Sequence, residues 1–173
     1  MDGKLAADFL RYSAEKLTQL SSRIQDCLSK LTYEQVWTRG ADSENAVGNL
    51  VLHLCGNVRQ WIGHGVGGQA DVRVRDREFA ARGEVQPVEL SERLEGTIRT
   101  ALDVLAKVTP ERLAEKVTIQ AYHVTVLEAI YHVVEHFSQH TGQIIFATKQ
   151  MTGQDPGYYR HLKGSAPHDE TIP

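Results

Sequence analysis

The segment Val133–Lys149, VVEHFSQHTGQIIFATK, places two histidines, His136 and His140, four residues apart within an apolar helical pattern. On an α-helix, residues at this spacing lie on one face, about 40° apart in azimuth and about 6 Å apart along the axis. Two imidazoles in this arrangement can bind one divalent ion. A third histidine from a facing helix would complete a set of three nitrogen ligands and leave coordination positions open for water or substrate.

The earlier segment Asn49–Trp61, NLVLHLCGNVRQW, supplies a candidate for that third ligand, His53. His53 belongs to a row of polar residues that runs beside the apolar stripe of its helix. The row comprises Asn49, His53, Asn57, Gln60 and His64. Buried polar groups cost free energy unless they are satisfied, so a purely structural helix would gain little from such a row. We expect it to carry one metal ligand with polar supports, for which Asn57 and Gln60 are candidates; a solvated helix edge is the alternative.

The later helix carries a further histidine, His132, one turn before His136. His132 and His140 lie about 12 Å apart along the axis, so all three cannot bind one ion together. When the helix is projected at about 100° per residue, His140 lies at the edge of the apolar arc and His132 lies toward the polar side. We therefore expect His136 and His140 to be the ligands, with His132 behind them or at the surface. No glutamate follows His136 directly, so the zinc-protease motif HExxH is excluded.

Four amphipathic segments dominate the chain, with apolar residues recurring at spacings of three and four. They cover residues 4–30, 45–63, 88–107 and 125–151. A capping box at Thr125 and Glu128 marks the start of the last segment. We expect the glycine-rich stretch 64–68 to end the second helix, the charged stretch 71–82 to form an irregular crossover, and 117–124 to be extended. The pattern predicts an all-α protein, a four-helix bundle with a long crossover between helices two and three.

The chain has 173 residues and 41% apolar residues, which is typical of a globular protein with a substantial core. We expect residues 1–151 to form the bundle. Residues 152–173 are rich in glycine, proline, serine and aspartate, and we expect them to form an irregular C-terminal tail.

The charge pattern and the cysteine content exclude several other classes of protein. Lysine and arginine are scattered and the net charge is −3, which argues against nucleic acid as the main partner. We expect no secretory signal and no membrane span, because the required apolar runs are missing from the sequence. The two cysteines, Cys27 and Cys55, do not make a disulfide framework and indicate a reducing cytoplasm. We therefore expect a cytoplasmic protein that acts on a small-molecule substrate.

The two quoted segments resemble those of the DinB-like (YfiT-like) superfamily of metal-binding four-helix bundles. The resemblance rests on the pattern H-x-x-x-H-x-G-Q-I in the last helix and one earlier histidine in helix two, and the helix lengths and crossover match as well. By position, it implies that His53 is the first metal ligand, that His136 and His140 are the pair, and that Gln143 is structural. It also implies a homodimer and a divalent ion such as nickel, zinc or iron.

Some members of this superfamily are thiol S-transferases that use bacillithiol, mycothiol or glutathione. The leading hypothesis is accordingly a metal-dependent transferase, in which the metal holds a low-molecular-weight thiol as the thiolate for attack on a small electrophile. One alternative is a metal-dependent hydrolase, for which the sequence offers no convincing base. A second alternative is a bundle that binds metal or a partner without turnover. The ligand set alone does not select among the divalent ions.

Overall fold

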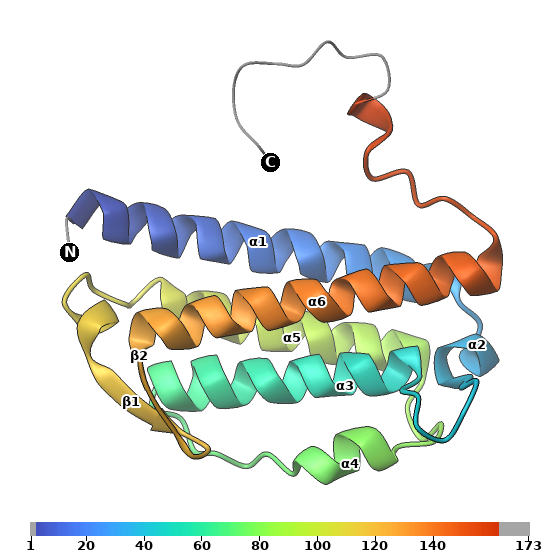
Figure 1. The fold of residues 1–173 in the computed structure, drawn as a ribbon, viewed down its shortest axis with the longest axis horizontal. Helices are drawn as coiled ribbons and strands as arrows, with labels where there is room; N and C mark the ends of the chain where they lie inside the picture. The colour runs from blue at the N-terminus through green and yellow to red at the C-terminus, as the bar shows by residue number, and fades with distance from the viewer. Residues whose placement is uncertain (1–2, 163–173) are drawn as a thin grey trace.

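The computed structural model describes residues 3–162, and four long helices dominate this part of the chain (Figure 1). These helices are α1 (Gly3–Lys30), α3 (Val47–Val58), α5 (Pro87–Leu105) and α6 (Val126–Thr152). Both α1 and α3 pack against α5 and α6, so the four helices enclose one core. The predicted all-α four-helix bundle is therefore confirmed.

The directions of the helices explain the long crossover. Helices α1 and α6 run from left to right in Figure 1, whereas α3 and α5 run from right to left. Because α3 and α5 are parallel, the chain between them must return along the length of the bundle. This crossover carries a short helix, α4 (Arg75–Ala80), which packs against α3. The crossover was predicted, but its description as irregular is wrong where α4 forms.

The shorter elements lie at the two ends of the bundle. Helix α2 (Tyr33–Trp37) and the 3₁₀ turn η2 (Arg112–Ala114) lie in the connections that follow α1 and α5. The extended piece expected at 117–124 is an antiparallel hairpin of β1 (Lys116–Ile119) and β2 (Tyr122–Thr125). The predicted capping box follows it: the Thr125 hydroxyl accepts from the Glu128 amide at 3.2 Å, and the Glu128 carboxylate accepts from the Thr125 amide at 2.7 Å.

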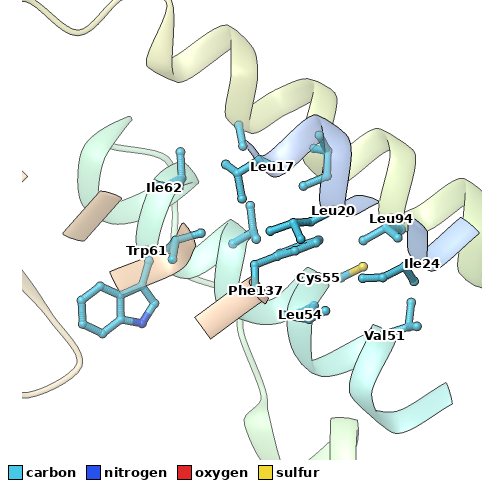
Figure 2. Packing of buried hydrophobic residues seen from close by; sticks show 14 of the residues in the cluster. Leu17, Leu20, Ile24, Val51, Leu54, Cys55, Trp61, Ile62, Leu94 and Phe137 are labelled. Carbon is cyan, nitrogen blue, oxygen red and sulfur yellow. The ribbon is translucent and has the colours of Figure 1, made fainter. Parts of the chain in front are cut away.

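The apolar stripes of the four helices meet in a core centred on Phe137. Figure 2 shows Phe137 of α6 among Leu17 and Leu20 of α1, Leu54 of α3 and Leu94 of α5. Phe137, Leu17, Leu54 and Leu94 are fully buried. Burying each such side chain contributes about 1.5–3 kcal/mol relative to leaving it exposed, so this core fixes the rotation of each helix about its axis.

The glycine-rich stretch ends the second helix, as predicted. The chain first continues from α3 into a π-helix, η1 (Arg59–Val66), and Gly67 is the C-cap of that helix. A Cβ at Gly65 would collide with the side chain of Ile119, and a Cβ at Gly67 would lie 2.8 Å from Val104. These glycines therefore serve close packing of the hairpin and of α5 against η1.

The segment that follows α6 returns along α1. Helix α6 ends at Gly153, which adopts a left-handed conformation with φ of 67° that glycine accommodates without strain. Farther on, the Tyr158 hydroxyl donates to Asp26 at 2.7 Å, and a 3₁₀ turn, η3 (Arg160–Leu162), closes the described chain. The remainder of the predicted tail, residues 163–173, lies outside the described residues. Within residues 3–162, no helix has the length and apolar character needed to cross a membrane.

Candidate metal centre

The three histidines singled out in the sequence meet where α3 faces α6. Nε2 of His136 lies 3.1 Å from Nε2 of His53 and 3.1 Å from Nε2 of His140. One ligand atom from each residue lies within 4.8 Å of the other two. Nitrogens on a tetrahedral ion with bonds of about 2.0–2.1 Å are about 3.3 Å apart, so both 3.1 Å separations suit such an ion. Binding of a metal here remains a prediction.

The core packing brings these rings together. His136 precedes Phe137, whose fully buried side chain fixes the rotation of α6. His140 follows one turn later on the same face, as the spacing of four residues requires. His53 is only 6% exposed, whereas His136 and His140 are half-buried. The cluster therefore lies at the margin of the core, where one side is shielded and the other faces a cavity.

His53 is held from behind by Glu78 of α4. Nδ1 of His53 lies 3.0 Å from Oε2 of Glu78. The carboxylate also accepts two hydrogen bonds from Arg73, each of 2.8 Å, and the side chains of Arg73 and Glu78 are only 4% and 10% exposed. Nη2 of Arg73 also lies 3.1 Å from Nδ1 of His53, but it donates to Glu78 at the shorter distance of 2.8 Å. We therefore assign the proton to Nδ1 of His53, which donates it to the carboxylate. The lone pair of Nε2 is thereby directed at the other two imidazoles, as in the carboxylate–histidine–metal arrangement.

Glu78 keeps its negative charge in this buried position. Burial alone would raise the pKa of the Glu78 carboxyl, but the hydrogen bonds from Arg73 and His53 outweigh it, and the pKa lies below its ordinary value. Gly56 makes the approach possible, because a Cβ at this position would collide with Oε1 of Glu78. A glycine three residues after His53 thus gives α4 access to the back of the imidazole.

His140 has a neutral support on its own helix. Its Nδ1 lies 2.6 Å from Oε1 of Gln143, an acceptor, so Nδ1 of His140 also carries the proton and Nε2 offers a lone pair. Burial lowers the pKa of His140, and the hydrogen bond to Gln143 opposes this shift in part. Gln143, expected to be structural, therefore orients one of the candidate ligands.

His136 occupies the middle of the cluster and is the most strongly perturbed of the three. Burial, followed by repulsion from His140 and His53, lowers the pKa of His136 to about 3. The ring is therefore neutral at physiological pH, as a metal ligand must be. Its Nδ1 is buried and has no hydrogen-bond partner among residues 3–162.

Two members of the polar row on α3 and η1 hold the crossover in place. Asn49 donates to the backbone carbonyl of Glu78 at 2.8 Å. Gln60 accepts from Nη1 of Arg73 at 2.9 Å. Gln60 therefore supports His53 indirectly, through the Arg73–Glu78 pair. This agrees with the expectation that Gln60 is a polar support.

The other two members of the row do not support the histidines. Asn57 makes no hydrogen bond within the described chain, although it is only 4% exposed. His64 contacts the backbone carbonyl of Gln69 through Nδ1 at 2.7 Å. The expectation that Asn57 is a polar support is therefore wrong.

Arg73 and Glu78 were not predicted from the sequence. Both lie in the charged crossover, where no helical or strand periodicity indicates which side chains turn inward. Gly56 was the available signal, because a glycine on the face of α3 beside His53 indicates that another chain segment approaches closely.

A cavity of about 430 Å³ opens beside the histidine cluster, and His53 and His136 are among its lining residues. His132 lies in its wall, with its ring 4.1 Å from that of Trp61 and 5.6 Å from that of His136. A larger cavity of about 580 Å³ lies along the crossover, but its lining includes none of these histidines. The smaller cavity is therefore the one that gives a ligand access to the cluster.

Comparison with known families gives one match that covers most of the chain. Residues 4–162 match the model of the family described as "Protein of unknown function (DUF1572)". A search of curated proteins gives no match.

Solved structures share the fold at low sequence identity. A conserved protein from Enterococcus faecalis has a TM-score of 0.69 and 16% identity, over 83% of this chain and 97% of that one. A mutant of a mycothiol-dependent maleylpyruvate isomerase has a TM-score of 0.62 and 13% identity, over 78% of this chain and 60% of that one. At these identities the likeness concerns the fold alone, a helical bundle.

Proposed function

The chain belongs to the family described as "Protein of unknown function (DUF1572)", and we propose that it is a divalent-metal-dependent enzyme that joins a low-molecular-weight thiol to small electrophiles. The observation that carries the proposal is the convergence of the Nε2 atoms of His53, His136 and His140 beside a cavity. Three imidazoles with an open side suit a catalytic metal ion better than a structural one, which is enclosed by four protein ligands.

The residues of the chain prepare this site for thiol chemistry. His53, His136 and His140 would hold a divalent ion, which would supply a Lewis acid that keeps a bound thiol as the thiolate near neutral pH. Glu78 and Gln143 orient the imidazoles of His53 and His140, and burial keeps His136 neutral. In the transfer, sulfur forms a bond to the electrophilic carbon, the leaving group departs with its electron pair, and the thiol proton passes to water.

The thiols of the chain itself are poorly placed for this chemistry. Cys55 is buried, and burial raises the pKa of its thiol to about 11. Cys27 is fully buried against the segment after α6, with Sγ 3.7 Å from the Tyr158 hydroxyl. Neither cysteine lines the cavity beside the histidines. A thiol that reacts there must therefore come from a cosubstrate.

The fold likeness to a mycothiol-dependent enzyme supports the thiol as cosubstrate. Hydrolysis is the weaker candidate, because the carboxylate closest to the cluster, Glu78, already binds His53 and Arg73 and is not free to activate water. The proposal includes a small-molecule electrophile, a homodimeric state and a cytoplasmic location, and zinc, nickel and iron are the candidate ions.

A coupled assay of metal and thiol tests this function. The purified protein is stripped of metal, reloaded with zinc, nickel or iron(II), and given glutathione with 1-chloro-2,4-dinitrobenzene, while the absorbance of the thioether product is followed. We expect turnover that needs both metal and thiol and stops on chelation. His136→Ala should be inactive, and His161→Ala, a histidine on η3 far from the cluster, should match the unmodified protein. Metal-dependent hydrolysis without thiol, or metal binding without turnover on any electrophile, would contradict the proposal.

A further inference from the structure

Apart from His136, Asn57 is the one side chain of the cavity wall with a buried polar atom that has no hydrogen-bond partner in the described chain. It is 4% exposed, its Oδ1 is buried without a partner, and its carboxamide makes no hydrogen bond. A buried polar group without a partner lowers the stability of the fold, because no hydrogen bond replaces those that it makes with water in the unfolded chain. Such a group is retained at a cost to folding, and in a cavity wall the natural partner is a bound molecule.

The position of Asn57 places it between the histidines and an aromatic wall. It follows His53 by one helical turn, and Trp61 follows Asn57 by another turn, so the three side chains form a row along α3 and η1. Figure 2 shows the indole of Trp61 pointing away from the core cluster around Phe137. Its ring lies 6.0 Å from that of Tyr122 in the hairpin. A ligand whose reactive atom is at the histidines therefore passes Asn57 before it reaches these rings.

The cavity wall carries one guanidinium, that of Arg75, without an ion pair in the described chain. Arg75, exposed on α4, lines the cavity and lies over the ring of Phe79 at 4.7 Å, but it makes no side-chain ion pair or hydrogen bond with residues 3–162. Arg73 is committed to Glu78. The lining includes one acidic side chain, Glu128, whose carboxylate accepts a hydrogen bond from the Thr125 amide at the N-terminus of α6. Arg75 is thus a guanidinium available to an anionic ligand.

We propose that Asn57 and Arg75 bind the amide and the carboxylate of a small acidic ligand whose reactive atom lies at the histidine cluster. A carboxamide offers both a donor and an acceptor, and an amide group of a ligand matches both. A guanidinium pairs with a carboxylate through two parallel hydrogen bonds. The inference deepens the proposed function, on which it rests, by naming the chemistry of the ligand. The ligand is either the thiol cosubstrate or the electrophile, and the test separates these two sources.

The test compares four probes on metal-loaded protein. N-acetylcysteine carries sulfur, amide and carboxylate; 3-mercaptopropionate lacks the amide; N-acetylalanine lacks the sulfur; propionate lacks both. Dissociation constants are measured by calorimetry. We expect each amide probe to bind roughly tenfold more tightly than its amide-free counterpart, a factor equivalent to about 1.4 kcal/mol. If this preference appears only with the sulfur probes, the ligand is the thiol; if it appears in both pairs, the electrophile carries the amide.

Two variants assign the effect to the two residues. Asn57→Leu, of similar volume, should abolish the amide preference, retain the metal content, and unfold at an equal or higher temperature because an unpaired amide has been removed. Asn57→Ala serves as a second variant of the same position if leucine does not fit. Arg75→Gln should weaken the binding of all four acids about three- to tenfold while preserving the amide preference.

The inference is overturned if the unmodified protein shows no amide preference or if the preference survives in both Asn57 variants. It is also overturned if Asn57→Leu unfolds at a lower temperature than the unmodified protein, because Asn57 would then have a structural role. Its failure is distinguishable from failure of the proposed function. Thiol-dependent turnover without amide preference would support the proposed transferase and contradict the proposed binding site at Asn57. Amide preference with N-acetylalanine, without any thiol-dependent turnover, would support the binding site at Asn57 and contradict the proposed transferase.

Discussion

The two sides of the histidine cluster are supported in different ways. On α3, the buried His53 is held by an ionised carboxylate, Glu78, which comes from a segment 25 residues farther along the chain. On α6, His140 is held by the neutral amide of Gln143, three residues away on the same helix. The pair on α6 is positioned by local helical geometry, whereas the third ligand depends on the docking of the crossover. We therefore expect the two sides to respond unequally to substitution.

Removal of the central imidazole should have the largest effect. Because His136 contacts the rings of both other histidines, His136→Ala should reduce metal affinity by more than the roughly 10–100-fold typical of losing a supporting group. The helical circular dichroism should remain nearly unchanged, since Phe137 and the core are untouched. Elemental analysis after dialysis measures the loss. Unfolding of this variant with unchanged metal content would identify His136 as a core residue instead.

The support on α3 should matter next. Glu78→Gln keeps the shape of the side chain but removes the charge that holds Arg73 and fixes the proton on Nδ1 of His53, so metal affinity should fall about 10–100-fold. Thermal stability should fall as well, because Arg73 is left buried without its counter-charge. Competition with a chelator measures the affinity. Glu135→Gln, which removes an exposed charge beside His136, is the matched control and should have little effect.

The support on α6 should matter less than the support on α3. Gln143→Leu removes one neutral hydrogen bond to His140, and this half-buried ring can form a replacement bond with water. We expect a loss of metal affinity of less than about tenfold, because a neutral hydrogen bond contributes only about 1 kcal/mol. The same chelator competition applies. If Gln143→Leu lowered metal affinity as much as Glu78→Gln does, the proposed difference between the two sides of the cluster would be wrong.

The smallest effect on metal affinity is expected for His132→Ala. His132 stacks on Trp61 and lies outside the convergent cluster, so its removal should leave metal content intact and alter ligand binding in the cavity instead. Metal content and probe affinity, measured on the same sample, separate these outcomes. Equal metal loss at His132 and His140 would contradict the ligand assignment from the helical projection.

The parts of the molecule that local geometry determines were predictable from the sequence. The spacing of His136 and His140, the capping box at Thr125, and the apolar stripes each depend on residues within a few positions of one another. The approach of His53 to this pair was also anticipated, because a bundle brings the polar margins of facing helices together.

The parts that tertiary contacts determine were not predictable. Glu78 lies in a charged stretch with no periodicity, and its inward orientation depends on the space at Gly56. The helix stop expected in the stretch 64–68 lies at Val66, but the π-helix that precedes it was not predicted, and Gly65 within it is required by packing against Ile119. In each case a contact between distant segments overrides the local preference.

The most direct test of the central claim is anomalous diffraction from crystals of the metal-loaded protein, with data collected on both sides of the absorption edge of the ion. The three-histidine site predicts one peak per chain, about 2.0–2.2 Å from Nε2 of each of His53, His136 and His140. A peak bound by the α6 pair without His53, or the absence of any peak at the cluster in protein shown to contain metal, would contradict it.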